Sequence, residues 1–142
     1  MSIVDGQLIS GRYRLQTVLG CGGMAAVWRG IDERLGRPVA VKLLDKADTV
    51  DPAMLQRFDR EARTAGSLTH PNIVAVYDVG RDSGVPYLVM ELIDGTSLAT
   101  LLAGGPLPID QAIDVARQIC DALAVAHGQG VVHRDIKPAN IL

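Results

Sequence analysis

The most specific chemical pattern of the sequence lies at residues 133–140, which read HRDIKPAN. It places a carboxylate at Asp135, an ammonium group at Lys137 and an amide at Asn140 in one short segment. Phosphoryl transfer uses such a set, because a carboxylate accepts the proton of the attacking hydroxyl, a cation offsets charge on the transferred group and an amide oxygen binds Mg²⁺. We therefore predict Asp135 and Lys137 as catalytic residues and Asn140 as a metal ligand.

A glycine-rich segment, LGCGGMAAV at residues 19–27, lies between two stretches that favour strands. Glycine lets backbone N–H groups approach phosphate oxygens closely. An ordinary hairpin turn fits the segment equally well. A dinucleotide-binding turn is a further alternative, but it requires a helix directly afterwards and an acid about 20 residues on. Here a β-rich stretch follows the glycines, and the residue at about that distance from Gly20 is a lysine, Lys42, and not an acid. The residues predicted to contact phosphate or nucleotide are Leu19, Gly20, Gly22 and Gly23.

Lys42 ends the apolar run VAVK at residues 39–42. A buried ammonium group without a partner is costly, so the lysine either faces solvent or pairs with a carboxylate. Glu61 follows Phe58 by three residues and borders the apolar stripe of a predicted helix. Glu61 alone would also fit a solvated acid. We predict a Lys42–Glu61 pair that directs the lysine towards phosphate oxygens, and we count both residues among the catalytic set.

The elements that must position these groups change in type along the chain. Strands are predicted in the first part and helices in the second, with one helix between the third and fourth strands. Its predicted cap is Asp51, with Pro52 at the first helical position. The predicted strands cover residues 13–19, 25–31, 39–44, 73–80 and 86–92, and the predicted helices cover residues 52–66, 97–102 and 108–126.

Composition excludes several classes of function. The net charge of −2 provides no field for nucleic acid or an anionic membrane surface. No apolar run is long enough to span a membrane, and the first residues do not resemble a signal peptide. Cys21 and Cys120 are the only cysteines, which favours a reducing cytoplasm over a disulfide scaffold.

The order of these parts resembles the eukaryotic-type protein serine/threonine kinases. The glycine-rich segment, VAVK, the helix glutamate, HPNIV at residues 70–74, YLVME at residues 87–91 and HRDIKPAN follow one another as in that family. The resemblance covers about residues 10–142 and is strongest to the bacterial receptor-type (actinobacterial-like) kinases, whose glycine loops often read GxGGM. Lys137, two residues after Asp135, resembles the serine/threonine class, since tyrosine kinases usually carry alanine or arginine there.

The resemblance implies ATP and Mg²⁺ as cofactors and further binding residues. Met90 resembles the residue that borders the adenine site, and Glu91 and Ile93 would offer a backbone C=O and N–H to the adenine edge. Three apolar side chains would enclose the ring, although they and Met90 also fit ordinary core packing. These three are Val27, Ala40 and Leu142.

The fold class implied is α+β, with a protein-kinase-like fold. A five-stranded antiparallel N-lobe sheet with one helix would occupy residues 10–94 and bind nucleotide. Residues 95–142 would form the first helices and the catalytic loop of a truncated helical C-lobe.

Two departures from the family pattern bear on activity. Ala25 stands where the third loop glycine is usual, and no Asp-Phe-Gly occurs in the 142 residues. We expect phosphoryl transfer from Mg·ATP to Ser and Thr hydroxyls of protein substrates for the whole domain, but no transfer by this fragment alone.

Three alternatives remain open from the sequence: a pseudokinase or ATP-binding interaction module, a small-molecule phosphotransferase, and a nucleotide-free structural or dimerisation domain. The expected partners are protein substrates and a second copy through the N-lobe. The expected location is cytoplasmic, with a membrane anchor conceivable in a C-terminal segment outside this chain.

Overall fold

The computed structural model describes residues 4–22, 25–44 and 52–142. The chain divides into two compact units. Unit 1 comprises residues 1–67 and 75–92, and unit 2 comprises residues 68–74 and 93–142. The predicted cap Asp51 and the predicted nucleotide contact Gly23 lie outside the described residues.

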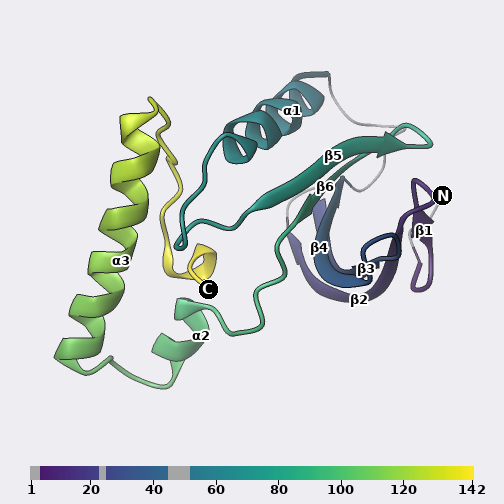
Figure 1. Cartoon of the computed structure of the whole chain (residues 1–142). Coiled ribbons are helices and arrows are strands. Elements are labelled where there is room, and N and C mark those ends of the chain that lie inside the picture. Colours follow the sequence, from purple (N-terminus) through teal and green to yellow (C-terminus); the bar gives the residue numbers. More distant parts are fainter. Residues whose placement is uncertain (1–3, 23–24, 45–51) are drawn as a thin grey trace. The chain divides into compact units, whose positions relative to one another are not determined.

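The described part of unit 1 consists of antiparallel strands and one helix (Figure 1). The strand order in the sheet is β1-β2-β3-β4-β6-β5, and each neighbouring pair is antiparallel. The elements of unit 1 are β1 (Leu8–Ile9), β2 (Tyr13–Gly22), β3 (Ala25–Asp32), β4 (Arg37–Leu44), α1 (Pro52–Gly66), β5 (Val76–Asp82) and β6 (Val85–Met90).

The described sheet therefore has six strands, and the prediction of five was wrong in this detail. The additional strand is β1, whose Leu8 and Ile9 pair with Arg14 and Tyr13. Two residues are too few to show an alternating pattern in the sequence, so β1 is recognised only from its pairing.

Strand β4 lies inside the sheet and divides its side chains between two faces. Val39, Val41 and Leu43 are fully buried on one face, in a core completed by strands β2, β3 and β6. Because successive residues of a strand point to opposite faces, Ala40 and Lys42 belong to the other face.

Helix α1 covers part of that other face. Phe58 and Ala62 are buried in a second cluster with Leu44 and Leu88. Their spacing of four residues places both on one side of the helix, as the apolar stripe of the sequence predicts. In Figure 1 the helix lies beside β5, with which it shares contacts.

Asp32, at the end of β3, organises the turn into β4. Its side chain is 1% exposed and accepts two hydrogen bonds from the Arg12 guanidinium, at 3.0 and 2.7 Å. It also accepts the backbone N–H groups of Arg34 and Leu35, at 3.1 and 3.3 Å. The charge of Asp32 is thus fully hydrogen-bonded, as a buried carboxylate requires.

Unit 2 contains α2 (Leu98–Ala103), α3 (Ile109–Gly128) and the short 3₁₀ turn η2 (Pro138–Asn140). Ser97 caps α2 by accepting the backbone N–H of Thr100 at 3.2 Å. The first turns of α3 remain uncovered, with Ile109 78% exposed. None of the helices in the described part of the chain is long and apolar enough to cross a membrane.

The two largest errors in the predicted strand boundaries are of three residues each. Strand β5 begins at Val76 rather than residue 73, because the residues before Ala75 do not pair with β6. Strand β2 continues to Gly22, three residues beyond the prediction, because Gly20 and Gly22 pair with β3. The apolar periodicity of the sequence shows which residues favour strands but not where pairing starts and stops.

Replacement of Asp32 by Ala is expected to lower the free energy of unfolding by about 2–3 kcal/mol, because the Arg12 guanidinium and two N–H groups lose their acceptor. Urea unfolding at pH 7 measures this change, with the exposed Asp5→Ala as control.

Hydrogen bonds from Arg12 lower the pKa of Asp32 below its usual value. The carboxylate therefore contributes stability at pH values above the usual aspartate pKa of about 4, and the contribution is lost as the pH falls through the lowered pKa. The difference between wild type and Asp32→Ala should shrink in acid. A constant difference from pH 7 to pH 2 would contradict this assignment.

Candidate active site

The structure joins Lys42 of β4 to Glu61 of α1. The Lys42 Nζ atom lies 2.7 Å from Glu61 Oε1, and the side chains are 25% and 59% exposed. Lys42 is flanked in the sheet by Val27 on β3 and Leu88 on β6. An ammonium group among apolar neighbours needs a counter-charge, and α1 supplies it. Of the two alternatives left by the sequence, the structure shows the paired lysine.

Several of the predicted nucleotide contacts share the face of the sheet on which Lys42 lies. Residues directly opposite one another in an antiparallel pair point to the same face, and so do residues two apart on one strand. Val27 lies opposite both Lys42 and Gly20, and Ala40 lies opposite Met90. One face of unit 1 thus carries a cation next to small and apolar side chains.

The glycine-rich segment forms the end of the β2–β3 hairpin. The register shifts between Val18 and Gly20, so that Leu19 has no partner on β3, and its side chain is 52% exposed. A Cβ atom placed on Gly20 would meet no atom of the described residues within 4 Å. In the described part of the chain the face at Gly20 is therefore open, and no packing there requires glycine.

Two backbone groups after β6 keep free hydrogen-bonding capacity. The Glu91 N–H donates to the Ala75 C=O at 2.8 Å, and its carboxylate accepts the Ala75 N–H at 3.2 Å. Within the described part of the chain, no hydrogen bond uses the Glu91 C=O or the Ile93 N–H. These are the two groups that the resemblance assigns to an adenine edge.

In unit 2 the HRDIKPAN segment folds back on itself around Asp135. The Asp135 carboxylate lies 2.9 Å from Lys137 Nζ, and Asn140 Nδ2 donates to the Asp135 backbone C=O at 3.0 Å and to its carboxylate at 3.2 Å. The Asp135 N–H donates to Nδ1 of His133 at 3.2 Å. Three predicted site residues, Asp135, Lys137 and Asn140, therefore form one cluster.

The backbone of the segment is turned sharply at two places. Arg134 has φ of 67°, in the left-handed region that non-glycine residues rarely adopt. Pro138 begins the η2 turn, in which the Asn140 N–H donates to the Lys137 C=O at 2.9 Å. A fixed proline φ favours the start of such a turn. The two turns bring Asn140 back to Asp135.

The ammonium group of Lys137 holds the pKa of Asp135 below its usual value, with further lowering by the Asn140 hydrogen bond. The carboxylate is therefore ionised at neutral pH and accepts hydrogen bonds. A substrate hydroxyl next to Asp135 could therefore donate its hydrogen bond to the carboxylate, which in its ionised form has no proton of its own to donate.

Asn140 can also serve a metal ion. Both of its side-chain hydrogen bonds use the amide nitrogen, so Oδ1 has no partner among the described residues. Among those residues, no group of three His, Cys, Asp or Glu side chains could hold a metal. An amide oxygen suits Mg²⁺, which is usually bound by one or two protein groups together with substrate phosphates and water.

One charged cluster was not predicted from the sequence. Asp59 of α1 forms an ion pair with Arg81 of β5, and Arg63 of α1 lines the same pocket. In the sequence, Asp59 and Arg63 are recognisable only as charged neighbours of Glu61. Arg81 lies 22 residues after Asp59, and the apolar periodicity of the sequence does not predict a contact between them.

Replacement of Lys137 by Met is expected to raise the pKa of Asp135 towards the usual aspartate value, because the nearest cation is removed. A ¹³C NMR titration of the side-chain carboxyl groups measures this pKa. The control is Arg117→Gln, since Arg117 pairs with Asp114 and Asp121 of the same unit. An unchanged Asp135 pKa in Lys137→Met would show that the ion pair does not form.

The comparisons with known proteins agree with these features. Residues 13–142 match the family model "Protein kinase domain". The serine/threonine-protein kinase PknA of Mycobacterium tuberculosis is 46% identical over 148 residues, which cover 100% of this chain and 34% of PknA. The serine/threonine-protein kinase PrkC of Bacillus subtilis is 46% identical over 138 residues, covering 96% of this chain and 21% of PrkC.

Solved structures give the same result. The crystal structure of the Mycobacterium tuberculosis PknI kinase domain matches with a TM-score of 0.83 and 30% identity, over 98% of this chain and 56% of that domain. The chain thus spans between a fifth and about a half of the proteins it resembles. The matched family model, the two bacterial relatives and the shared fold place this chain in the protein kinase domain family, among the bacterial serine/threonine kinases.

Proposed function

We propose that the chain is the nucleotide-binding lobe and the first part of the catalytic lobe of a serine/threonine protein kinase. The complete domain would transfer the γ-phosphoryl group of Mg·ATP to Ser and Thr hydroxyls of proteins. The observation that carries the proposal is the Asp135 cluster, which holds an ionised carboxylate 2.9 Å from a lysine ammonium group and 3.2 Å from an asparagine amide.

In this proposal residues 10–94 bind the nucleotide. Lys42, oriented by Glu61, contacts phosphate oxygens, and the open backbone at Gly20, with Leu19 and Gly22, lies over the phosphates. The adenine is bound by backbone groups of Glu91 and Ile93. Its ring packs against the apolar side chains Val27, Ala40 and Met90 of unit 1.

Residues 95–142 supply the groups that act on the transferred phosphoryl. Asp135 orients the attacking hydroxyl and accepts its proton, and Lys137 offsets charge on the equatorial oxygens. Asn140 holds Mg²⁺ through the amide oxygen that no described residue uses; the ion, when bound, neutralises phosphate charge. Positioning and charge stabilisation account for most of the rate in such a reaction.

The substrate class follows from Lys137 and from the relatives. The relatives PknA and PrkC are both named serine/threonine-protein kinases. In this chain the Lys137 ammonium group contacts the carboxylate proposed to receive the hydroxyl proton, which is the arrangement expected for the serine/threonine class.

Replacement of Lys42 by Met is expected to weaken Mg·ATP binding about tenfold, because a charge-assisted contact to phosphate is lost. Isothermal titration calorimetry on the 142-residue chain measures the affinity. The matched control is Arg34→Gln, which removes an exposed cation from the turn between β3 and β4. Equal affinity in wild type and Lys42→Met would refute the role of Lys42 in phosphate binding.

The 142 residues assayed alone are expected to transfer no phosphate. Their sequence contains no Asp-Phe-Gly, whose aspartate supplies the second metal ligand in protein kinases. The measurement is incorporation of γ-labelled phosphate from Mg·ATP into a basic protein substrate. Incorporation that disappears in Asp135→Asn would contradict the expectation and show that one protein ligand for the metal is enough.

A further inference from the structure

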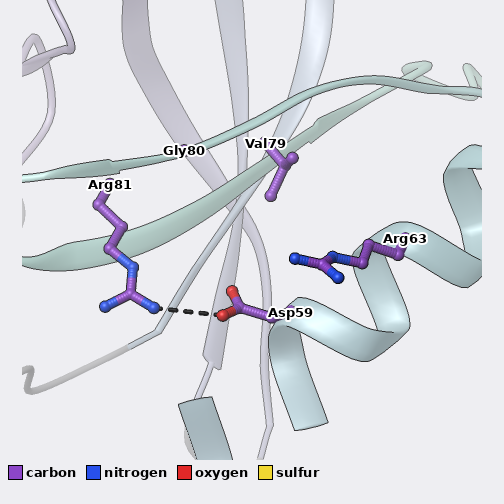
Figure 2. Close-up of a pocket in the computed structure, with 5 residues that line it drawn as sticks. All are labelled: Asp59, Arg63, Val79, Gly80 and Arg81. Atoms are coloured by element: carbon purple, nitrogen blue, oxygen red, sulfur yellow. Dashed lines mark hydrogen bonds and ion pairs between the residues drawn. The ribbon is translucent and has the colours of Figure 1, made fainter. Parts of the chain in front are cut away.

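Unit 1 has a cleft between α1 and β5 of about 220 Å³, lined by Asp59, Arg63, Val79, Gly80 and Arg81 (Figure 2). Asp59 and Glu61 are two residues apart on α1, and residues at that spacing do not share a face of a helix. The cleft is therefore separate from the Lys42–Glu61 pair and from the residues that we assign to ATP.

The cleft carries more positive than negative charge. Arg81 Nη2 lies 3.2 Å from Asp59 Oδ2, and the two side chains are 50% and 46% exposed. The Arg63 side chain lines the same cleft in Figure 2 and forms no hydrogen bond or ion pair with any described residue. The cleft thus holds two guanidinium groups and one carboxylate, and the carboxylate pairs with Arg81 alone, which leaves the positive charge of Arg63 without a partner among the described residues.

A second hollow of about 310 Å³ adjoins the cleft along the same helix. It shares Asp59 and Arg63 with the cleft and adds Arg60, whose side chain is exposed. The positive surface therefore extends along one side of α1.

The cleft also offers an apolar contact. Val79 is 47% exposed and belongs to β5, the strand at the edge of the described sheet. Gly80 beside it cannot carry a side chain, because a Cβ atom there would lie 2.5 Å from the Tyr87 hydroxyl oxygen. A ligand in the cleft would therefore contact the apolar side chain of Val79 and the backbone of Gly80. The two arginines of the cleft would lie on either side of these residues.

We propose that this cleft binds a phosphorylated peptide segment of a partner protein. Arg guanidinium groups bind phosphate through paired, charge-assisted hydrogen bonds, and a dianionic phosphate matches Arg63 and Arg81 together. A peptide carboxylate would add only one charge where Asp59 already provides one. The residue next to the phosphorylated position packs on Val79.

The proposed ligand would link α1 to β5. Because α1 also carries Glu61, a bound phosphopeptide adds an attachment to the helix that orients Lys42. The binding proposal itself depends only on unit 1 and does not require that the chain transfer phosphate.

The test uses a fluorescein-labelled peptide library in which one fixed phosphothreonine is flanked by Leu, Val and Ile, with the unphosphorylated library as its counterpart. Fluorescence polarisation with the 142-residue chain is expected to show binding of the phosphorylated library and binding at least about tenfold weaker without phosphate. Arg63→Gln and Arg81→Gln are each expected to weaken phosphopeptide binding about tenfold.

Arg29→Gln is the matched control, because it removes an exposed arginine from β3 of the same unit and should leave binding unchanged. The exposed Arg81–Asp59 pair contributes little stability, so Arg81→Gln is expected to fold, and urea unfolding verifies this for every variant.

Absence of binding by the wild type, or equal affinity for both libraries, would overturn the proposal. An equal loss in Arg29→Gln would also overturn it, since it would indicate general attraction to anions. Binding of phosphatidylglycerol vesicles that depends on Arg63 and Arg81, without phosphopeptide binding, would assign the cleft to a membrane surface instead.

Discussion

The alternation of side chains along β4 is the constraint on which the rest of unit 1 depends. One set of its residues fills the main core, so Ala40 and Lys42 must occupy the opposite face. The ammonium group of Lys42 then lies beside apolar neighbours, where an unpaired charge is costly. Glu61 provides the counter-charge only when α1 packs with Phe58 against the same face of the sheet. The position of the helix and the orientation of the lysine are therefore determined together.

In unit 2 the arrangement of the HRDIKPAN segment depends on backbone turns rather than on charge. Asp135 and Lys137 are 62% and 52% exposed, and exposed ion pairs contribute little stability. The connection that fixes the segment is Asn140, whose backbone N–H donates to the Lys137 C=O and whose amide donates to the Asp135 C=O. Arg134 has a positive φ that the chain adopts only at some cost. Asn140 thus has two functions in the proposed mechanism, since its nitrogen closes the loop while its oxygen is kept for the metal.

The sequence predicted those parts of the structure that follow from local chemistry. The Lys42–Glu61 pair was predictable because a lysine in an apolar strand needs a partner and Glu61 borders an apolar stripe. The short turn between β5 and β6 likewise follows from local chemistry, because Ser83 and Gly84 both have positive φ, as a tight hairpin turn requires. Strand β1 and the Arg81–Asp59 contact were not predictable. The strand is too short to show a period, and the contact joins a helix to a strand through tertiary packing alone.

Helix α1 contributes residues to both of the proposed binding sites. Among its described side chains only Phe58 and Ala62 are buried, and at its margins the helix is joined to the sheet by two partly exposed ion pairs, Lys42–Glu61 and Arg81–Asp59. Each such pair contributes little by itself, so the helix is held chiefly by a small apolar contact. An element held in this way changes its position for a small free energy. Any ligand that strengthens the attachment at the β5 side therefore also favours the helix position in which Glu61 reaches Lys42, provided that the ligand binds this position more tightly than the alternatives.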